Sequence, residues 1–268
     1  MLYFLRSGGH RFRGGRSMHI HQVRPADRAR ISLMQGQEVI RRMFLARRNA
    51  TMLNEETKVK LWELAAASPL ILWFTLGIIG SAVKLWEVDD EAPPVLGMCT
   101  RIATIALLAL VIRFLIIRHP VVKKVKGVSP RLTAVAALGL PSLLALLPRA
   151  DMSPLTAGLS SGLALLGLIA SIVTIQYLGR SFSVMPQARK VVTEGPYRIV
   201  RHPLYLAELV VTIGVMWRFE QPWPLIILAV TIGVQLLRMR FEEKILLDTF
   251  PGYREYAERT ARLVPGFY

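Results

Sequence analysis

The sequence predicts an all-α integral membrane protein, a polytopic bundle of about six transmembrane helices with cytoplasmic N- and C-termini. Three observations lead to this fold class. Of the 268 residues, 53% are hydrophobic and only 19% are charged. The mean hydropathy of +0.40 is high for a soluble domain of this length. The apolar residues gather in separate runs, and the basic residues concentrate in alternate connections between them.

Six apolar runs are the predicted membrane spans. They lie at residues 64–84, 99–117, 132–147, 155–178, 204–217 and 223–237. A span needs about 20 apolar residues, with a range of about 17–25, so the third run and the last two are short. Only residues 218–222 separate the last two runs. This spacing predicts a tight helical hairpin whose members tilt or stop short of the far face.

The charge pattern orients these spans. The N-terminal region and the connections at 118–131 and 179–203 are rich in Lys and Arg. The alternate connections are acidic or balanced, most clearly at residues 87–91, which hold four acids. Because Lys and Arg are retained on the cytoplasmic side of a membrane, this alternation places both termini in the cytoplasm.

The net charge of +16 has a simpler explanation than nucleic-acid binding. The bases lie in predicted cytoplasmic connections, where they set topology and attract anionic lipid headgroups. Cys99 is the only cysteine, which excludes an internal disulfide and a thiol-ligated metal cluster. We therefore expect the lipid bilayer as a partner, no nucleic acid and no metal site, and the oligomeric state stays open.

Residues 1–60 are predicted to be a basic N-terminal extension. Within it, residues 1–17 are expected to be disordered or to precede a true start at Met18. Residues 26–63 alternate apolar and basic residues in the manner of an amphipathic helix that lies on a membrane surface. A mitochondrial-type targeting peptide is the alternative for this region.

Residues 61–178 are predicted to be a four-helix transmembrane scaffold. They contain one small-residue motif, Gly158-x-x-x-Gly162, which permits close helix approach but is common in membrane bundles. No internal repeat and no inverted pair of broken helices indicates a transporter. The polar residues concentrate instead in residues 179–268, which contain the hairpin.

The most informative stretch of the chain is segment 195–205, Gly-Pro-Tyr-Arg-Ile-Val-Arg-His-Pro-Leu-Tyr, which lies between two apolar runs. Polar residues are costly within the hydrocarbon core of a membrane. Where they occur there, they indicate a functional site. On a helix that begins near Arg201, Tyr205 and Glu208 share the face of Arg201, and His202 lies beside them. Glu208 lies more than one turn inside an apolar run, where a lone carboxylate needs a partner.

A second polar stripe is predicted on the sixth helix. It consists of Gln235, Arg238 and Glu242 at i, i+3 and i+7. Since the hairpin makes the last two helices antiparallel, the two stripes can face each other near the cytoplasmic end. Taken singly, these residues also fit an i,i+4 ion pair, topology-setting arginines and interfacial tyrosines. Those explanations leave Glu208 and His202 without a role, so the residues together favour a functional site.

The combined pattern resembles a known family. Segment 195–205, the pair Glu242-Glu243, the Gly-Tyr-x-x-Tyr within 250–256 and the Arg-Leu-Val-Pro at 262–265 are similar to the isoprenylcysteine carboxyl methyltransferase family and its bacterial relatives. Phospholipid N-methyltransferases share part of the pattern. The resemblance covers about a third of the chain and implies a multi-pass membrane enzyme, in the inner membrane of a bacterium or the endoplasmic reticulum of a eukaryote.

The resemblance implies S-adenosylmethionine as cofactor, bound at the cytosolic face by a catalytic region at 179–268 that ends in a tail helix. The implied cofactor-binding residues are Gly195, Pro196, Tyr197, Arg198, His202, Pro203, Tyr205, Glu242, Glu243, Tyr253 and Tyr256. Arg198, His202 and the backbone N–H groups of the turn at Gly195 suit the carboxylate of the cofactor. Carboxylates and aromatic faces suit its ammonium and sulfonium groups.

The implied reaction transfers a methyl group to a lipidic or prenylated acceptor, expected to be a carboxylate. The candidate catalytic residues are Arg201, Tyr205, Glu208, Glu242 and Glu243. A carboxylate needs a cationic clamp, for which Arg201 is the candidate. An amine needs a base, for which Glu208 or one of the paired glutamates is the candidate. A phospholipid amine N-methyltransferase, an NADPH-dependent membrane reductase and a membrane scaffold or transporter without activity stay open as alternatives.

Overall fold

The computed structural model describes residues 25–86 and 93–266. The predictions for residues 1–17, for a start at Met18 and for the acidic connection at 87–91 lie outside the described residues. The chain divides into two compact units, which meet between Val59 and Lys60.

The described part of the first unit is helical. It belongs to α1, which runs from Pro25 to Val83, so the predicted helix over 26–63 is confirmed and is continuous with the first predicted span. Ile40, Met43 and Phe44 are exposed on it, at the i, i+3 and i+4 spacing of one helix face. A location of this face on a membrane surface stays a prediction.

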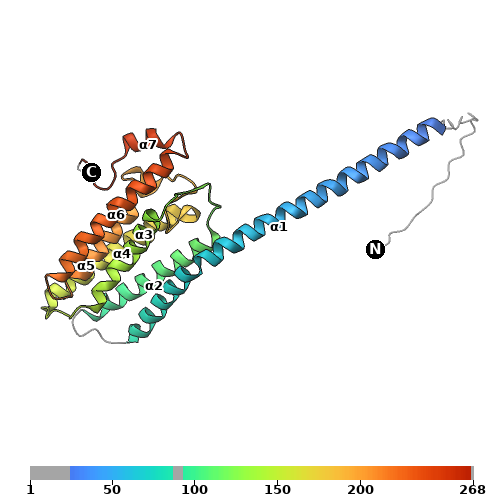
Figure 1. The fold of residues 1–268 in the computed structure, drawn as a ribbon. Helices are drawn as coiled ribbons and strands as arrows, with labels where there is room; N and C mark the ends of the chain where they lie inside the picture. The colour runs from blue at the N-terminus through green and yellow to red at the C-terminus, as the bar shows by residue number, and fades with distance from the viewer. Residues whose placement is uncertain (1–24, 87–92, 267–268) are drawn as a thin grey trace, which may run out of the picture. The chain divides into compact units, whose positions relative to one another are not determined.

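The second unit is a bundle of helices (Figure 1). After α1 its elements are η1 (Lys84–Trp86), α2 (Pro94–Ile117), β1 (Lys123–Lys124), α3 (Ser129–Gly139), η2 (Leu140–Leu146), α4 (Pro154–Leu178), η3 (Gly179–Ser181), β2 (Gln187–Ala188), η4 (Gly195–Arg198), α5 (Pro203–Met216), α6 (Trp223–Leu247) and α7 (Tyr253–Arg259), where η marks a 3-10 helix. The only described strands are β1 and β2, which form one short antiparallel pair. The all-α membrane fold class is confirmed.

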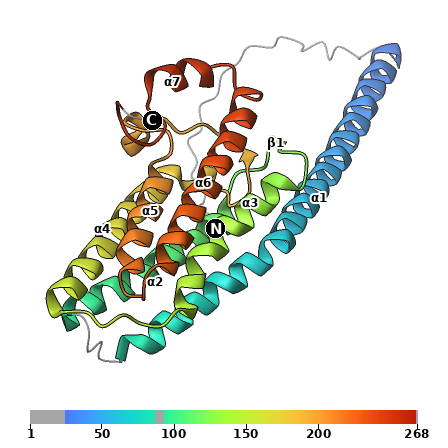
Figure 2. The same ribbon diagram turned by 60° about the vertical axis from the view of Figure 1, so that its left-hand side comes forward.

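Five described segments are long and apolar enough to cross a membrane. They are Thr57–Val83, Pro94–Ile117, Ser129–Leu146, Pro154–Ser181 and Trp223–Leu247. The fifth predicted run forms α5, whose 14 residues fall below the roughly 17 that a crossing needs. The hairpin of α5 and α6 is present, and both views show α5 beside α4 (Figure 2). Helix α6 continues to Leu247, well past the predicted end of its span.

Helices α4 and α5 pack with their backbones in contact. A Cβ atom on Gly214 would lie 2.5 Å from the backbone nitrogen of Ala164, and one on Gly167 would lie 2.7 Å from that of Val211. The hydroxyl of Ser160 donates to the Gly214 carbonyl at 2.7 Å. Small residues permit this approach because they leave room for the neighbouring backbone. Close packing of this kind stabilises the contact between membrane helices.

The predicted Gly158-x-x-x-Gly162 motif is not the point of close contact. A Cβ on Gly158 would meet only the ring of Pro93 at 3.8 Å, and one on Gly162 would meet nothing within 4 Å. The reason is orientation, because Gly167 and Gly214 each face the backbone of the partner helix and the glycines of the motif do not.

We predict that Gly214→Ala lowers the free energy of unfolding by about 1–3 kcal/mol, because the added methyl group has no space against the α4 backbone. Gly162→Ala is the matched control, since it places the same methyl group in open space on α4. Thermal unfolding of the purified protein in detergent measures both. Equal stability of the two variants would contradict the observed packing.

Candidate active site

A cavity of about 280 Å³ lies beside the N-terminal end of α5 and the C-terminal half of α6. Its polar lining residues are Ser171, Ser183, Lys190, Tyr197, Arg201, His202, Tyr205, Glu208, Arg238, Glu242, Tyr253 and Tyr256. The rest of the lining is apolar and includes Phe74, Val111 and Ile175, which belong to the main hydrophobic core. The volume is near the lower end of the roughly 300–1,000 Å³ typical of small-molecule sites.

The turn before α5 depends on Gly195. Its φ of +58° lies in the left-handed region, which glycine adopts without strain. A Cβ at this position would also lie 2.4 Å from the ring of Tyr177 on α4. Pro196 follows as the second residue of η4. Glycine and proline here shape the turn, and neither residue lines the cavity.

Helix α5 begins later than predicted. Pro203 is its first residue, a position where the missing N–H of proline costs nothing, and His202 occupies the N-cap. Arg201 therefore precedes the helix instead of starting it, which corrects the predicted stripe. Tyr205 and Glu208 remain on one helix face, and Arg201 reaches the cavity from the preceding extended segment.

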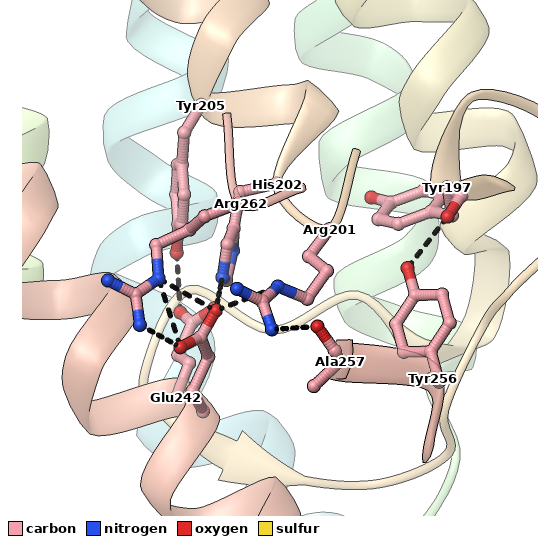
Figure 3. Close-up of polar contacts among 9 residues, drawn as sticks. Tyr197, Arg201, His202, Tyr205, Glu242, Tyr256, Ala257 and Arg262 are labelled. Carbon is pink, nitrogen blue, oxygen red and sulfur yellow. Dashed lines mark hydrogen bonds and ion pairs between the residues drawn. The ribbon is translucent and has the colours of Figure 1, made fainter. Parts of the chain in front are cut away.

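Three basic side chains surround the carboxylate of Glu243. Figure 3 shows these three, Arg201, His202 and Arg262, pointing toward one another. Arg262 donates to it through Nη2 at 2.6 Å and through Nε at 3.0 Å. His202 Nε2 and Arg201 Nε lie 3.1 Å and 3.3 Å from Oε1. The Glu243 side chain is only 9% exposed, so solvent screens these pairs little. Two guanidinium groups and the His202 ring thus contact this carboxylate, and Glu243 is absent from the cavity lining.

The neighbouring carboxylate, Glu242, does line the cavity. The Tyr205 hydroxyl donates to its Oε1 at 2.5 Å, and Arg238 Nε lies 3.3 Å from the same atom. The Arg238 guanidinium is 4.8 Å from the centre of the Tyr205 ring and donates to the Val184 carbonyl at 2.8 Å. Adjacent residues on a helix point about 100° apart, which explains the different surroundings of Glu242 and Glu243.

The structure brings the two predicted polar stripes together. Gln235 on α6 donates to the carboxylate of Glu208 on α5 at 3.2 Å. Arg238 and Glu242 then continue the α6 stripe toward Tyr205. Glu208 thereby has the partner that its apolar helix requires, and it also lines the cavity.

The C-terminal segment closes the cluster from a part of the chain that the predicted stripes did not include. The Arg201 and His202 amides donate to the carbonyls of Ala261 and Arg262 at 2.8 Å and 3.1 Å. The Arg201 guanidinium also donates to the Ala257 carbonyl at 2.7 Å. Arg262 was missed as a site residue. The only signal for it was its place in the Arg-Leu-Val-Pro part of the resemblance.

Three tyrosines outside the predicted spans supply neutral aromatic faces. Burial raises the pKa of Tyr197 and of Tyr253 well above 10, and it raises the pKa of Tyr256 to about 12. All three therefore keep their protons at neutral pH. The Tyr256 hydroxyl donates to the Tyr197 carbonyl at 2.7 Å, which joins α7 to η4 (Figure 3).

The loop over the cavity is held by a buried arginine. Arg189 donates to Gln187 Oε1 at 2.9 Å and to the carbonyl of His119, and it lies 3.6 Å from the carboxylate of Glu63. Burial lowers the pKa of Arg189 to about 10, so the guanidinium stays charged at neutral pH. Arg118 pairs with the same carboxylate of Glu63. This cluster fixes residues 182–192, of which six line the cavity.

The predicted site residues thus fall into three groups. Tyr197, Arg201, His202, Tyr205, Glu208, Glu242, Tyr253 and Tyr256 line the cavity. Gly195, Pro196, Pro203 and Glu243 shape or hold the segments around it. Arg198 is exposed and does not line it. Arg238 lies in the cavity wall although the predicted site did not include it.

Comparison with known proteins finds similarity to membrane methyltransferases over part of the chain. Residues 155–252 match the family model of phospholipid methyltransferases, which confirms the resemblance over α4, η4, α5 and α6. The chain is also 35% identical over 108 residues to protein-S-isoprenylcysteine O-methyltransferase B of Arabidopsis thaliana, which covers 38% of this chain and 55% of that protein.

Two bacterial relatives carry names from metal resistance. The cobalt-zinc-cadmium resistance protein CzcN of Cupriavidus metallidurans is 35% identical over 75 residues, 28% of this chain and 35% of the relative. The nickel-cobalt-cadmium resistance protein NccN of Alcaligenes xylosoxydans xylosoxydans is 30% identical over 112 residues, 40% of this chain and 52% of the relative. The chain therefore spans between about a third and about half of the length of these curated relatives.

We predict that Glu243→Gln lowers the free energy of unfolding by about 3 kcal/mol or more, because it leaves buried cations without their counter-charge. Glu255→Gln is the control, since Glu255 makes an exposed i,i+4 pair with Arg259 whose loss costs less than about 1 kcal/mol. Thermal unfolding in detergent compares the two. A Glu243→Gln protein as stable as the control would show that the cluster does not hold the C-terminal segment.

Proposed function

We propose that this protein is a membrane-embedded S-adenosylmethionine-dependent methyltransferase with a lipidic or prenylated acceptor. The observation that carries the proposal is the cavity, in which residues of opposite charge and several aromatic rings converge beside the ends of α5 and α6. Most of these residues lie within the segment that matches phospholipid methyltransferases. The similarity to an isoprenylcysteine O-methyltransferase supports the same reaction class.

The charges around the cavity are polarised in a way that suits this cofactor. On one side, Arg201 and Arg262 share the single carboxylate of Glu243, so two fixed positive charges surround one negative charge. On the other side, the carboxyl groups of Glu208 and Glu242 line the cavity, and Arg238 pairs with Glu242. S-adenosylmethionine supplies an activated methyl group when it is bound, and it carries a carboxylate together with ammonium and sulfonium groups.

Each side of the cavity has a proposed binding role. His202 would hold the carboxylate of the cofactor, and Glu242 would hold its cationic end beside the ring of Tyr205. Tyr197, Tyr253 and Tyr256 supply aromatic contacts. Glu243 is a positioning residue, because it holds Arg201 and His202 in place without lining the cavity.

The acceptor decides which residues take part in the reaction. A carboxylate acceptor needs a cationic clamp, a role we assign to Arg201 together with Arg238, which both line the cavity. An amine acceptor must lose a proton, which Glu208 can accept. The match to phospholipid methyltransferases and the similarity to an isoprenylcysteine O-methyltransferase support a lipidic acceptor of either kind. In both cases the residues act mainly by orientation, which can supply about 7–11 kcal/mol of the barrier reduction.

The apolar part of the cavity lining suits a lipidic acceptor. Phe74, Val111 and Ile175 come from α1, α2 and α4, and each of these helices is long and apolar enough to cross a membrane. An acyl or prenyl chain in contact with these side chains leaves its polar end near Glu208 and Arg238. We propose that the acceptor enters from the bilayer and not from the aqueous phase.

We predict that Glu242→Gln weakens S-adenosylmethionine binding by about tenfold or more, the cost of a lost charge-assisted hydrogen bond. His202→Ala weakens it as well, and the exposed control Glu255→Gln does not. Titration of purified protein in nanodiscs measures the three affinities. Preferential binding of NADPH would favour a reductase, and binding of neither ligand would favour a scaffold.

The acceptor is identified with methyl-labelled S-adenosylmethionine and membranes that contain the protein. We expect label in a lipid or prenylated fraction, extracted and resolved by mass spectrometry. For a carboxylate acceptor, Arg201→Gln lowers kcat more than Glu208→Gln does. For an amine acceptor the order is reversed, and the pH profile of kcat then changes only in the Glu208→Gln variant. Label in water-soluble products alone would contradict a lipidic acceptor.

A further inference from the structure

A second hollow, separate from the cavity described above, lies between the N-terminal end of α3 and the C-terminal end of α6. Its volume is about 520 Å³. Its lining residues are Lys123, Lys124, Val125, Lys126, Gly127, Val128, Ser129, Pro130, Phe241, Lys244, Ile245 and Asp248. We propose that this hollow, defined here as the lysine hollow, binds the phosphate group of an anionic phospholipid.

The charge of the lysine hollow favours an anion. Four lysines line it, and Asp248 is the only acid in its lining. The Asp248 carboxylate lies 3.8 Å from the Lys123 ammonium group, which offsets that one charge. Lys124 and Lys126 from the α2–α3 connection and Lys244 from α6 then contribute three positive charges in excess of the acid.

Local structure places these lysines at the hollow from both sides. Strand β1 pairs with β2, with Lys123 opposite Ala188 and Lys124 opposite Gln187, and this pairing fixes the connection against the body of the bundle. Phe241, Lys244, Ile245 and Asp248 follow one another at i, i+3, i+4 and i+7 on one face of α6. The hollow therefore lies on a different face of α6 from Glu242.

The N-terminus of α3 opens onto the same hollow. Helix α3 begins at Ser129, and its N-cap residue Val128 provides no side-chain cap. The first N–H groups of a helix lack partners within the helix, and they attract anions together with the helix dipole. In α3, Pro130 has no N–H, and the amides of Arg131 and Leu132 donate to the Val128 carbonyl. The terminus therefore adds its helix dipole to the charge of the lysines, which suits phosphate oxygens.

The surroundings of the hollow favour a lipid over a soluble phosphate. It lies where one candidate span begins, at Ser129, and where another ends, at Leu247. Basic pockets between membrane helices near the cytoplasmic interface bind anionic lipid headgroups. Val128, Leu132 and Val135 are exposed by 68%, 62% and 54% along one face of α3. That apolar face leads away from the hollow and offers a surface for the acyl chains.

The test uses the full-length protein in detergent, with phosphatidylglycerol as the anionic probe and phosphatidylcholine as the zwitterionic comparison. Native mass spectrometry measures the bound lipid. The variant Lys126→Gln/Lys244→Gln removes one lysine from each side of the hollow. The control Arg240→Gln/Arg254→Gln removes two exposed positive charges near the same end of α6 but outside the hollow. Unfolding temperatures establish that both variants are folded.

We expect the lysine variant to lose about thirtyfold in affinity for phosphatidylglycerol, which corresponds to about 1 kcal/mol for each basic residue. The control keeps the wild-type affinity, and phosphatidylcholine binding is equal in all three proteins. Displacement of the lipid by inorganic phosphate would support the phosphate site but assign it to a soluble ligand. Equal losses in both variants, or no loss in the lysine variant, would overturn the proposal. The test does not depend on the proposed methyltransferase activity.

Discussion

The buried carboxylate of Glu243 holds together the parts of the chain that build the cavity. It contacts Arg201 and His202 before α5 and Arg262 near the C-terminus, and it lies on α6 itself. A charge at this depth is tolerated only when it is paired and hydrogen-bonded. The burial of Glu243 therefore depends on its contacts with Arg201, His202 and Arg262. The backbone hydrogen bonds from 201 and 202 to 261 and 262 extend the same connection.

Two adjacent glutamates on α6 have different surroundings because a helix turns about 100° for each residue. Glu243 points to the arginines and histidine and is neutralised within the protein. Glu242 points to the cavity and contacts Tyr205 and Arg238. The first orders the site, and the second is placed to contact a ligand. The hydrogen bond between Gln235 and Glu208 carries this polar arrangement one further turn into the bundle.

The length of α5 places this polar cluster at an edge of the bundle. Its 14 residues are too few to cross a bilayer, so the polar residues around its N-terminal end can remain near the interface. Although α5 is short, it packs closely against α4, because Gly214 and Gly167 let the two backbones approach each other. The loop that leads into this region is anchored by Arg189 and Glu63. Together these contacts form a rigid frame around one polar cavity with an apolar wall.

The sequence by itself determined the fold class, the approximate positions of the spans, the hairpin and the two polar stripes, because apolar runs and helical spacing are local properties. The resemblance of segment 195–205 and of Glu242-Glu243 likewise needed no coordinates. Only the tertiary structure decided that α5 starts at Pro203, that Arg262 joins the cluster, and that Arg198 stays outside the cavity. It also distinguished Gly214 from the Gly158 motif. These outcomes depend on which faces of distant segments meet, and that choice is made by packing and charge pairing across the whole bundle.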